Sequence, residues 1–327
     1  MSAGLQWLSF CSIWLAVLVA AYWGVCGVVA HRFTTARRRG AGGAESGALR
    51  GHQVHFPARD QRARIAAWYL PAESARGAVV FVHGRNSCRG DALKGQTVDL
   101  ARRLNARGLS VLMIDLRGHG QSTRGRLTYG WRERDDVLGA VDYLLERGYE
   151  GGTIGLLGAS MGGVAALGAA AADDAIGAVV AASPYADFGA MIDRCFTSMC
   201  GLPRLFVPGA LLAGRLLTGI DLRHVRALDH ARQLRGRPLV IIHARHDPLV
   251  PVADARALAI AGDATLWLTE CRVHIGSFAS DPAGYGARVA EFFCGHLRPH
   301  CATVAATASA TAPQLDGAVG ADELALA

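Results

Sequence analysis

Near the middle of the chain lies the sequence Gly155-Leu156-Leu157-Gly158-Ala159-Ser160-Met161-Gly162-Gly163. It joins a short apolar run, 153–157, which predicts a buried strand, to an Ala-rich segment, 163–172, which predicts a helix. The turn between them fits the pattern Gly-x-Ser-x-Gly, in which a strained serine stands exposed between a strand and a helix. Gly158 and Gly162 lack the side chains that would collide across so sharp a turn. The pattern therefore predicts a nucleophile at Ser160, with a passive serine in a Gly-rich turn as the alternative.

Outward from this turn, apolar runs that predict strands alternate with segments of helical spacing. The strands are expected at 54–57, 65–70, 78–82, 109–114, 153–157, 176–182, 238–243 and 264–268, and helices at 91–107, 135–147, 163–172, 252–261 and 285–297. This alternation predicts an α/β domain over residues 52–298, with a mostly parallel eight-stranded sheet and helices on both faces. Active sites of such sheets gather beyond the carboxyl ends of the strands.

Residues 188–235 form a longer connection than one ordinary crossover needs. The segment is apolar and helical in places, and it is broken at Pro203 and Pro208. Two interpretations stay open: a small helical cap over a site, or a crossover helix with surface decoration.

Composition excludes some classes of protein. Half of the 327 residues are hydrophobic, 51%, which allows a sizeable core, and the net charge of +7 comes almost entirely from arginine. The basic residues are scattered and lack interleaved aromatics, so we do not expect nucleic-acid binding.

The eight cysteines show no Cys-x-x-Cys pair and no zinc-ligand spacing, so no metal or cofactor is expected. Buried or free thiols are the favoured interpretation. A Cys195–Cys200 disulfide would require an oxidising compartment.

The N-terminal segment is long and apolar. Leu5–Ala30 contains no charged residue and is long enough to span a bilayer with some tilt, so residues 1–31 are predicted to be a transmembrane anchor. A cleaved signal peptide, with Val28-Val29-Ala30 as a weak cleavage site, and a buried core helix are the alternatives. A basic, Gly-rich linker is expected at 32–51 and a disordered tail at 299–327.

Basic residues flank only one end of the apolar segment. His31-Arg32 and Arg37-Arg38-Arg39 follow it, and no Lys or Arg precedes it. The positive-inside rule therefore predicts a single-pass protein of the cell membrane, with its catalytic domain in the cytoplasm.

A serine hydroxyl needs a base to take its proton, and the base needs a partner that orients it. His274 follows the last predicted strand and is the candidate base, while Asp247 follows the penultimate strand and is the candidate orienting acid. Ser, Asp and His in this chain order match the architecture expected for the Gly-x-Ser-x-Gly turn. Asp187 is the rival acid, and His246 is a competing histidine.

The tetrahedral intermediate of such a reaction needs two hydrogen-bond donors for its oxyanion. The backbone N–H groups of Met161 and Arg85 are the candidates, so both side chains should be partly replaceable. His83 and Gly84 are interpreted as residues that shape the loop before Arg85. His119 is a second-rank candidate with a structural role.

Several motifs together resemble the α/β-hydrolase superfamily, most of all its Bem46-like and serine aminopeptidase S33-like membrane-linked members. The motifs are Trp68-Tyr69-Leu70-Pro71, Val82-His83-Gly84, Asp115-Leu116-Arg117-Gly118-His119-Gly120-Gln121-Ser122, Gly158-Ala159-Ser160-Met161-Gly162-Gly163, Ser183-Pro184-Tyr185-Ala186-Asp187, His246-Asp247-Pro248-Leu249-Val250-Pro251 and His274-Ile275-Gly276-Ser277-Phe278. The resemblance covers residues 54–297 and implies a serine hydrolase that acts through an acyl-enzyme. In two places the chain departs from the family pattern. Asp60-Gln61 stands where Asp-Gly is common, and Arg85-Asn86-Ser87 replaces a more glycine-rich oxyanion loop.

The expected function is that of a membrane-anchored serine hydrolase cleaving a carboxylic ester, with an apolar acyl group as the favoured substrate. A serine peptidase of the aminopeptidase type, acting on a short peptide with the same triad, is one alternative. A non-catalytic, membrane-tethered binding protein on a hydrolase fold is the other. Dehalogenase and epoxide-hydrolase chemistry is disfavoured because those reactions use a carboxylate nucleophile where this chain has Ser160.

Overall fold

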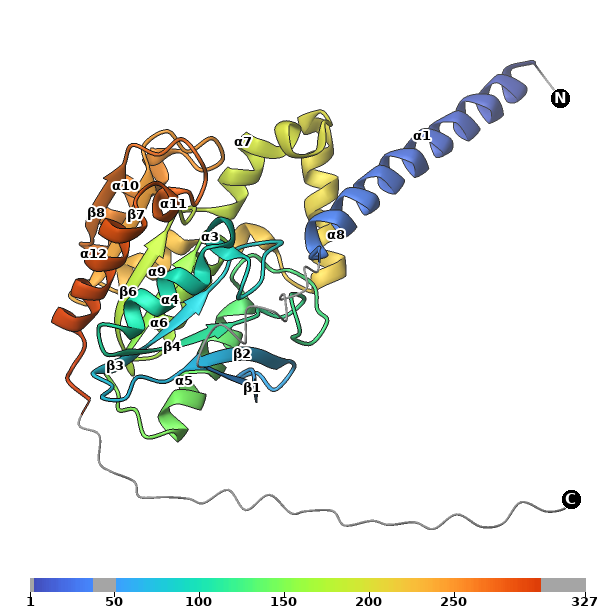
Figure 1. Ribbon diagram of the computed structural model, residues 1–327. Helices are drawn as coiled ribbons and strands as arrows, with labels where there is room; N and C mark the ends of the chain where they lie inside the picture. The colour runs from blue at the N-terminus through green and yellow to red at the C-terminus, as the bar shows by residue number, and fades with distance from the viewer. Residues whose placement is uncertain (1–2, 38–50, 301–327) are drawn as a thin grey trace, which may run out of the picture.

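A computed structural model describes residues 3–37 and 51–300 and shows one eight-stranded sheet at the centre of the molecule (Figure 1). The strand order is β1-β2-β4-β3-β5-β6-β7-β8, in which β1 and β2 are antiparallel to their neighbours and the others are parallel. The strands are β1 (His52–Pro57), β2 (Arg64–Leu70), β3 (Gly77–Val82), β4 (Leu109–Ile114), β5 (Ile154–Ala159), β6 (Ile176–Ala182), β7 (Leu239–Ala244) and β8 (Thr265–Thr269). The predicted eight-stranded, mostly parallel sheet is confirmed. Most of the expected linker and tail, together with Arg38, Arg39 and Cys301, lies outside the described residues.

Helices cover both faces of the sheet, as predicted, because the central strands are apolar on both sides. In β3, Val80 packs toward one face with α5 and α6, while Val79 and Phe81 pack toward the other with α4 and α12. The helices of these two layers are α4 (Thr97–Asn105), α5 (Glu133–Glu146), α6 (Met161–Ala172), α10 (Val252–Gly262) and α12 (Pro282–His296). Each strand thus contributes alternate side chains to two separate cores.

One predicted helix, 91–107, is wrong in its first half. The structure has a four-residue turn, α3 (Ala92–Gly95), before α4, and Leu93 and Lys94 have left-handed backbone angles, φ 51° and 61°. An α-helix cannot continue through left-handed residues. The side-chain spacing that predicted one helix carries no information about such backbone angles.

Residues 188–235 are mostly helical and connect β6 to β7. The first four elements of this segment are helix α7 (Phe188–Cys200), the 3-10 turn η1 (Arg204–Phe206), helix α8 (Val207–Thr218) and the 3-10 turn η2 (Leu222–His224). Helix α9 (Ala227–Gln233) packs against α6 and α10 and is the crossover helix between β6 and β7. Gly201 and Gly219, with φ 74° and 73°, end α7 and α8 with the left-handed residue that helix C-termini favour.

Helix α1 (Ala3–Thr34) projects away from the domain, and its C-terminal part, from about Tyr22 onward, packs against it (Figure 1). At 1.5 Å per residue its 32 residues are about 48 Å long. Cys26, Val29 and Ala30 are buried against α8, and the ring of Tyr22 stacks on Phe206 at 5.2 Å. The segment Trp7–Thr34 contains an 18-residue window with a mean hydropathy of 2.2 and is long and apolar enough to cross a membrane.

Candidate active site

Ser160 stands between the end of β5 and the start of α6, with backbone angles φ 53° and ψ −119°. A side chain in this region is strained, and such strain persists only where surrounding contacts hold it. The N–H of Ser160 donates to the carbonyl of Ala182 at 2.7 Å, and the carbonyl of Ser160 accepts from Gly163 at 2.9 Å. Strand, turn and helix therefore follow one another as the sequence pattern predicts.

Three glycines make this turn possible. A Cβ on Gly158 would overlap the carbonyl of Gly162, and a Cβ on Gly162 would overlap the carbonyls of Val82 and His83. A Cβ on Gly84 would lie 3.3 Å from the Cβ of Ser160. The loop after β3 thus lies directly against the turn that carries the serine.

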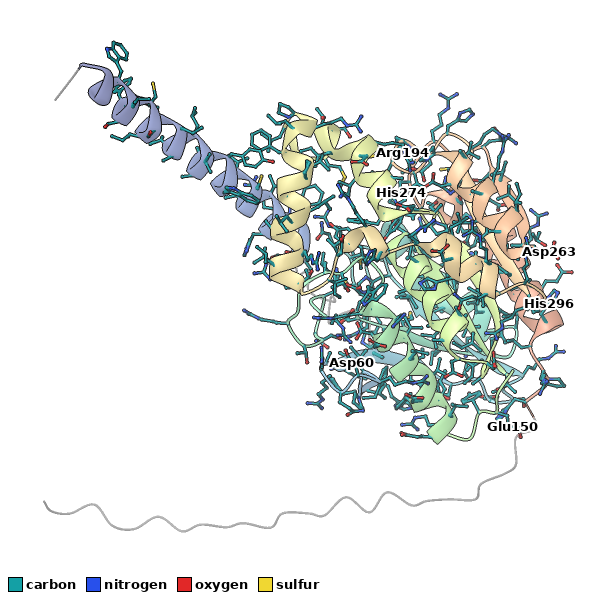
Figure 2. The ribbon with its side chains drawn as sticks, turned by 180° about the vertical axis from the view of Figure 1, so that it is seen from behind. Asp60, Glu150, Arg194, Asp263, His274 and His296 are labelled. Carbon is teal, nitrogen blue, oxygen red and sulfur yellow. The ribbon has the colours of Figure 1, made fainter. Side chains whose placement is uncertain are left out.

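The structure brings together the three residues that the sequence proposed as a triad. Oγ of Ser160 lies 2.8 Å from Nε2 of His274, and Nδ1 of His274 lies 2.7 Å from Oδ2 of Asp247. The side chain of Asp247 is fully buried and that of His274 is 17% exposed. His274 follows β8 and lies on the same side of the domain as α7, the helix of Arg194 (Figure 2).

The surroundings of Asp247 stabilise its ionised form. Burial opposes ionisation, but hydrogen bonds from His274 and from the N–H groups of Leu249 and Val250, at 2.8 and 3.0 Å, outweigh it and lower the pKa of Asp247. An ionised carboxylate beside Nδ1 holds the proton there and leaves the lone pair of Nε2 facing Ser160. This geometry can take the proton from the serine hydroxyl.

Asp187 and His246, the two rival candidates, contact residues outside the proposed triad. Asp187 accepts a hydrogen bond from the N–H of Ala190 at 2.9 Å, which caps α7, and pairs with Arg226 at 3.2 Å. His246 is half exposed, and its Nε2 lies 3.9 Å from Glu270. Asp187 therefore caps the start of α7 and braces the loop that follows β6.

Two neutral histidines brace the loop that holds Gly84 and Arg85. Nε2 of His83 accepts from the N–H of Leu116 at 3.0 Å, and Nε2 of His119 accepts from the N–H of Asn86 at 3.2 Å. Burial lowers the pKa of His83, and burial followed by the nearby His83 lowers the pKa of His119 to about 3. Both rings are therefore uncharged at neutral pH and can accept these backbone hydrogen bonds.

A buried ion pair fastens the same loop to the one after β4. Nη1 of Arg89 lies 2.6 Å from Oδ2 of Asp115, and both side chains are almost completely buried. The N–H of Arg89 also donates to Asp115 at 2.8 Å, and its guanidinium lies 4.7 Å from the ring centre of Trp68. A Cβ on Gly120 would overlap the Asp115 carboxylate. Sequence reasoning noticed Asp115 and Gly120 only as parts of a family motif and missed Arg89.

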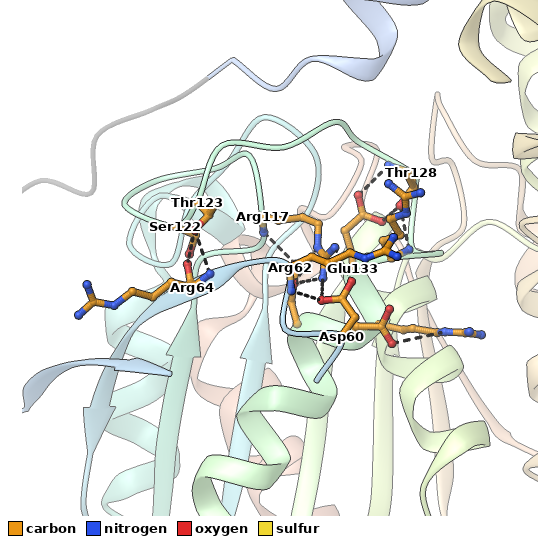
Figure 3. Close-up of polar contacts among 12 residues, drawn as sticks. Asp60, Arg62, Arg64, Arg117, Ser122, Thr123, Thr128 and Glu133 are labelled. Atoms are coloured by element: carbon orange, nitrogen blue, oxygen red, sulfur yellow. Dashed lines mark hydrogen bonds and ion pairs between the residues drawn. The ribbon is translucent and has the colours of Figure 1, made fainter. Parts of the chain in front are cut away.

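A second ion network, centred on Arg117, fastens the loop after β4 to α5 and to the turn between β1 and β2 (Figure 3). Arg117 donates to both oxygens of Asp60, at 2.9 and 3.0 Å, and to Asp136 at 2.8 Å. The buried carboxylate of Glu133 accepts from the N–H of Thr128 at 2.7 Å. Gln61, next to Asp60, has φ 58°, the left-handed conformation that a glycine adopts without strain. The glycine that the sequence resemblance leads one to expect after Asp60 is thus replaced by a residue less suited to the same turn.

The last turn of α1 lies on the candidate oxyanion loop, which the sequence did not suggest. The guanidinium of Arg85 donates to the carbonyl of Arg32 at 3.3 Å and lies 5.2 Å from the ring centre of Phe33. The N–H of Arg37 donates to Oδ1 of Asn86 at 2.9 Å. The apolar helix is therefore in direct contact with the loop beside Ser160.

A groove of about 1080 Å³ runs between α1, the end of α7 and this loop. Its walls are apolar along α1 and at α7, and basic beside Arg85. The lining residues are Ala21, Gly24, Val25, Val28, Val29, His31, Arg32, Phe33, Thr35, Ala36, Arg37, Arg85, Asn86, Met199, Cys200 and Leu202. No acidic side chain is among these described lining residues.

The described part of the chain contains no disulfide and no cluster of side chains that could bind a metal ion. None of the seven cysteines there forms a disulfide, and Sγ of Cys195 and Cys200 instead donate to the carbonyls of Leu249 and Phe196. Burial raises the pKa of the Cys195 thiol. Residues 3–37 and 51–300 contain no cluster of three or more His, Cys, Asp or Glu side chains able to hold a metal ion.

Sequence comparison finds similar proteins for the middle of the chain. The family model of serine aminopeptidase, S33, matches residues 73–226, a range that contains Ser160 and ends before Asp247 and His274. The uncharacterized protein YqkD of Bacillus subtilis (strain 168) is 31% identical over 190 residues, which are 57% of this chain and 62% of that protein. The match thus spans less than two thirds of that relative.

Solved structures share the fold at low identity. The esterase Pf2001 of Pyrococcus furiosus has a TM-score of 0.67 at 22% identity, over 81% of this chain and 98% of the esterase. The acylaminoacyl peptidase of Pyrococcus horikoshii has a TM-score of 0.57 at 17% identity, over 76% of this chain and 42% of the peptidase. At these identities the likeness establishes the fold.

Proposed function

We propose that this chain, an α/β-hydrolase of the serine-hydrolase class, cleaves a carboxylic ester through an acyl-enzyme on Ser160. The observation that carries the proposal is the continuous line of hydrogen-bond distances from Ser160 through His274 to Asp247, 2.8 and 2.7 Å. Each of the three residues follows a different parallel strand at its carboxyl end, where such sheets place their chemistry.

In the proposed reaction, Nε2 of His274 takes the proton of Ser160 while Oγ bonds to the ester carbonyl carbon. The ester C–O bond then breaks, and the alcohol leaves with the proton from His274. Water attacks the acyl-enzyme with His274 again as base, which releases the carboxylic acid and restores Ser160. Asp247 stabilises the imidazolium in both steps. The N–H groups of Met161 and Arg85 are the proposed donors to the oxyanion, and each such donor is worth about 3 kcal/mol in an enzyme of this kind.

The positive charges beside the oxyanion loop favour an ester substrate over a peptide that is cleaved after its N-terminal residue. An aminopeptidase substrate carries an α-ammonium group, which needs a carboxylate partner close to the scissile bond. The groove at this loop instead has Arg32, Arg37 and Arg85, and its described lining has no acidic residue. In addition, the chain covers 98% of the length of an esterase but 42% of that of a peptidase.

We further propose that α1 spans the cell membrane and remains part of the mature protein. Cleavage after Ala30 would remove Cys26, Val29 and Ala30, which are buried against α8, and would expose the apolar surface beneath them. Beside α1 the cap also carries exposed leucines, Leu205 at 71% and Leu216 at 78% exposure, which suits a position next to lipid.

The basic flank His31, Arg32 and Arg37 supports a cytoplasmic domain of residues 52–298, with 188–235 as its cap-like insertion. Protease added to spheroplasts should leave this domain intact, and protease added to inverted membrane vesicles should degrade it. Degradation in spheroplasts would place the domain outside instead.

The experiment for the proposed activity compares the full chain with a Ser160→Ala variant in detergent micelles. The unchanged chain should hydrolyse p-nitrophenyl butyrate, and Ser160→Ala should lose this turnover while its unfolding curve stays unchanged. Faster turnover of amino-acid p-nitroanilides than of the ester would establish the peptidase alternative. Absence of turnover with either substrate would support the non-catalytic alternative.

A further inference from the structure

We propose that the groove between α1 and α7 binds the acyl chain of a single-chain, anionic lipid ester that enters from the bilayer. This inference rests on the proposed function and names the substrate class of the same site. In the reaction, the acyl group passes to Oγ of Ser160 and the headgroup alcohol leaves. Water then releases a free fatty acid.

One wall of the groove is a face of α1 that is apolar from Ala21 to Val28 and ends at the basic Arg32. Ala21, Gly24, Val25, Val28 and Arg32 recur at three- and four-residue spacing, so their side chains lie along one side of the helix. The eleven-residue step from Ala21 to Arg32 is about 16 Å long at 1.5 Å per residue. The opposite wall is formed by residues 199, 200 and 202 at the end of α7. A groove whose wall on α1 is about 16 Å long and apolar as far as Val29 suits one extended acyl chain.

The two ends of the groove lie in different surroundings. At one end Ala21 precedes Tyr22 and Trp23, aromatic residues of the kind that mark the membrane–water boundary. At the other end lie Arg85 and Asn86 of the candidate oxyanion loop. Ser160 does not itself line the groove, but Gly84, the neighbour of Arg85, lies against it, so we infer that the ester group of a chain in the groove extends past Arg85 to the nucleophile.

The basic end of the groove selects for an anionic group close to the ester. The side chains of Arg32 and Arg37 are exposed there, Arg85 is half buried beside them, and His31 adds a further nitrogen donor. Guanidinium groups bind phosphate by paired, charge-assisted hydrogen bonds. A lysophospholipid with a phosphate a few bonds from its single ester satisfies both the apolar and the basic parts of the groove.

Two glycines of α1 provide a matched test. A Cβ on Gly24 meets no other atom within 4 Å, and the same holds for Gly27, but only Gly24 lines the groove. Gly24→Phe should fill the groove, while Gly27→Phe makes the same chemical change on another part of the helix surface. The measurement is kcat/KM for p-nitrophenyl dodecanoate divided by that for p-nitrophenyl acetate, with the full chain in detergent micelles.

The ratio should fall at least about tenfold in Gly24→Phe, because a hydrophobic site loses a factor of that order for each methylene it no longer accommodates. In Gly27→Phe this ratio of kcat/KM values should equal that of the unchanged chain. Equal ratios in all three proteins, or equal losses in both variants, would overturn the acyl-chain site. Turnover of the acetate ester reports the proposed hydrolase activity separately, so a failure of that activity is distinguishable.

Headgroup choice is tested with lysophosphatidylglycerol and lysophosphatidylcholine of the same chain length. The unchanged enzyme should prefer the first, since only its headgroup carries a net negative charge, and a double variant Arg32→Gln, Arg37→Gln should lose this preference. Native mass spectrometry of the Ser160→Ala protein should retain bound lysophosphatidylglycerol, and Gly24→Phe in that background should release it. Equal rates with the two lipids would overturn the anionic assignment. Protection by inorganic phosphate alone, without any dependence on chain length, would show an anion site without an acyl site.

Discussion

The guanidinium of Arg85 donates a hydrogen bond to the main-chain carbonyl of Arg32 at 3.3 Å, and so joins the proposed oxyanion loop to the last turn of the apolar helix. Arg85→Met keeps the backbone N–H that is proposed to hold the oxyanion but removes this link and the contact with Phe33. We expect kcat for p-nitrophenyl acetate to fall about tenfold, less than the loss caused by deleting an oxyanion donor, and KM to stay unchanged.

The control for this prediction is Arg124→Met, which makes the same change on an exposed arginine of the loop after β4. It should leave both constants unaltered. A raised KM with unchanged kcat in Arg85→Met would mean that the side chain binds substrate and does not position the loop.

Gly162 and Gly163 are adjacent, but only Gly162 lies where a side chain cannot fit. Gly162→Ala would force a Cβ into the carbonyls of Val82 and His83, so we expect the free energy of unfolding to fall by about 3 kcal/mol or more, with loss of activity. In Gly163→Ala the new Cβ stays 3.2 Å from the carbonyl of Gly158, and the better helix propensity of alanine, about 1 kcal/mol, offsets that contact. Urea unfolding of both variants in micelles checks this, and equal stabilities would contradict the account of the turn.

Asp247 and Asp187 are the two acids that sequence reasoning weighed as the partner of His274. Asp247→Asn should lower kcat about 10⁴-fold, because an amide favours the wrong tautomer of the imidazole and cannot stabilise its charged form. Asp187→Asn should keep kcat and lose some stability at the start of α7, where Asp187 caps the helix. The reverse ranking would transfer the role of orienting acid to Asp187.

His119 should make the protein less stable in acid. Its folded-state pKa is about 3 and its unfolded value is about 6.5, so between these limits the unfolded chain binds one more proton than the folded chain. Stability therefore falls as pH drops below about 6.5, by up to about 1.4 kcal/mol per pH unit from this residue. His119→Gln should flatten that slope, whereas the exposed His246→Gln should not. Urea midpoints measured across this range decide the point, and parallel slopes in all three proteins would refute it.

The sequence predicted the sheet and the turn at Ser160 because both depend on local patterns. Continuous apolar runs mark strands that are buried on both faces, and Gly158 and Gly162 mark a turn where side chains cannot fit. Asp247 and His274 were placed beside Ser160 by their positions after strands, without any knowledge of distance. The distances of 2.8 and 2.7 Å in the structure agree with that placement, and the catalytic roles of the three residues stay predictions.

The contacts of α1 could not be predicted in the same way. Apolar composition indicates that a helix can cross a membrane, but it does not reveal which part packs on α8 or that Arg85 reaches Arg32 over 53 positions in sequence. Arg89 was missed for a related reason, since its partner Asp115 is close only through the fold. The left-handed backbone at Leu93 and Lys94 interrupts the helix that the spacing of side chains predicted, because that spacing does not report backbone angles.

The central claim, that Ser160 is the nucleophile, is tested most directly by mapping the adduct of a fluorophosphonate probe on the full chain. Mass spectrometry of the digested protein should locate one covalent phosphonyl group on the peptide that contains Ser160. The Ser160→Ala variant should carry none, and Asp187→Asn should label like the unchanged chain. An adduct on another residue, or undiminished labelling of Ser160→Ala, would contradict the claim.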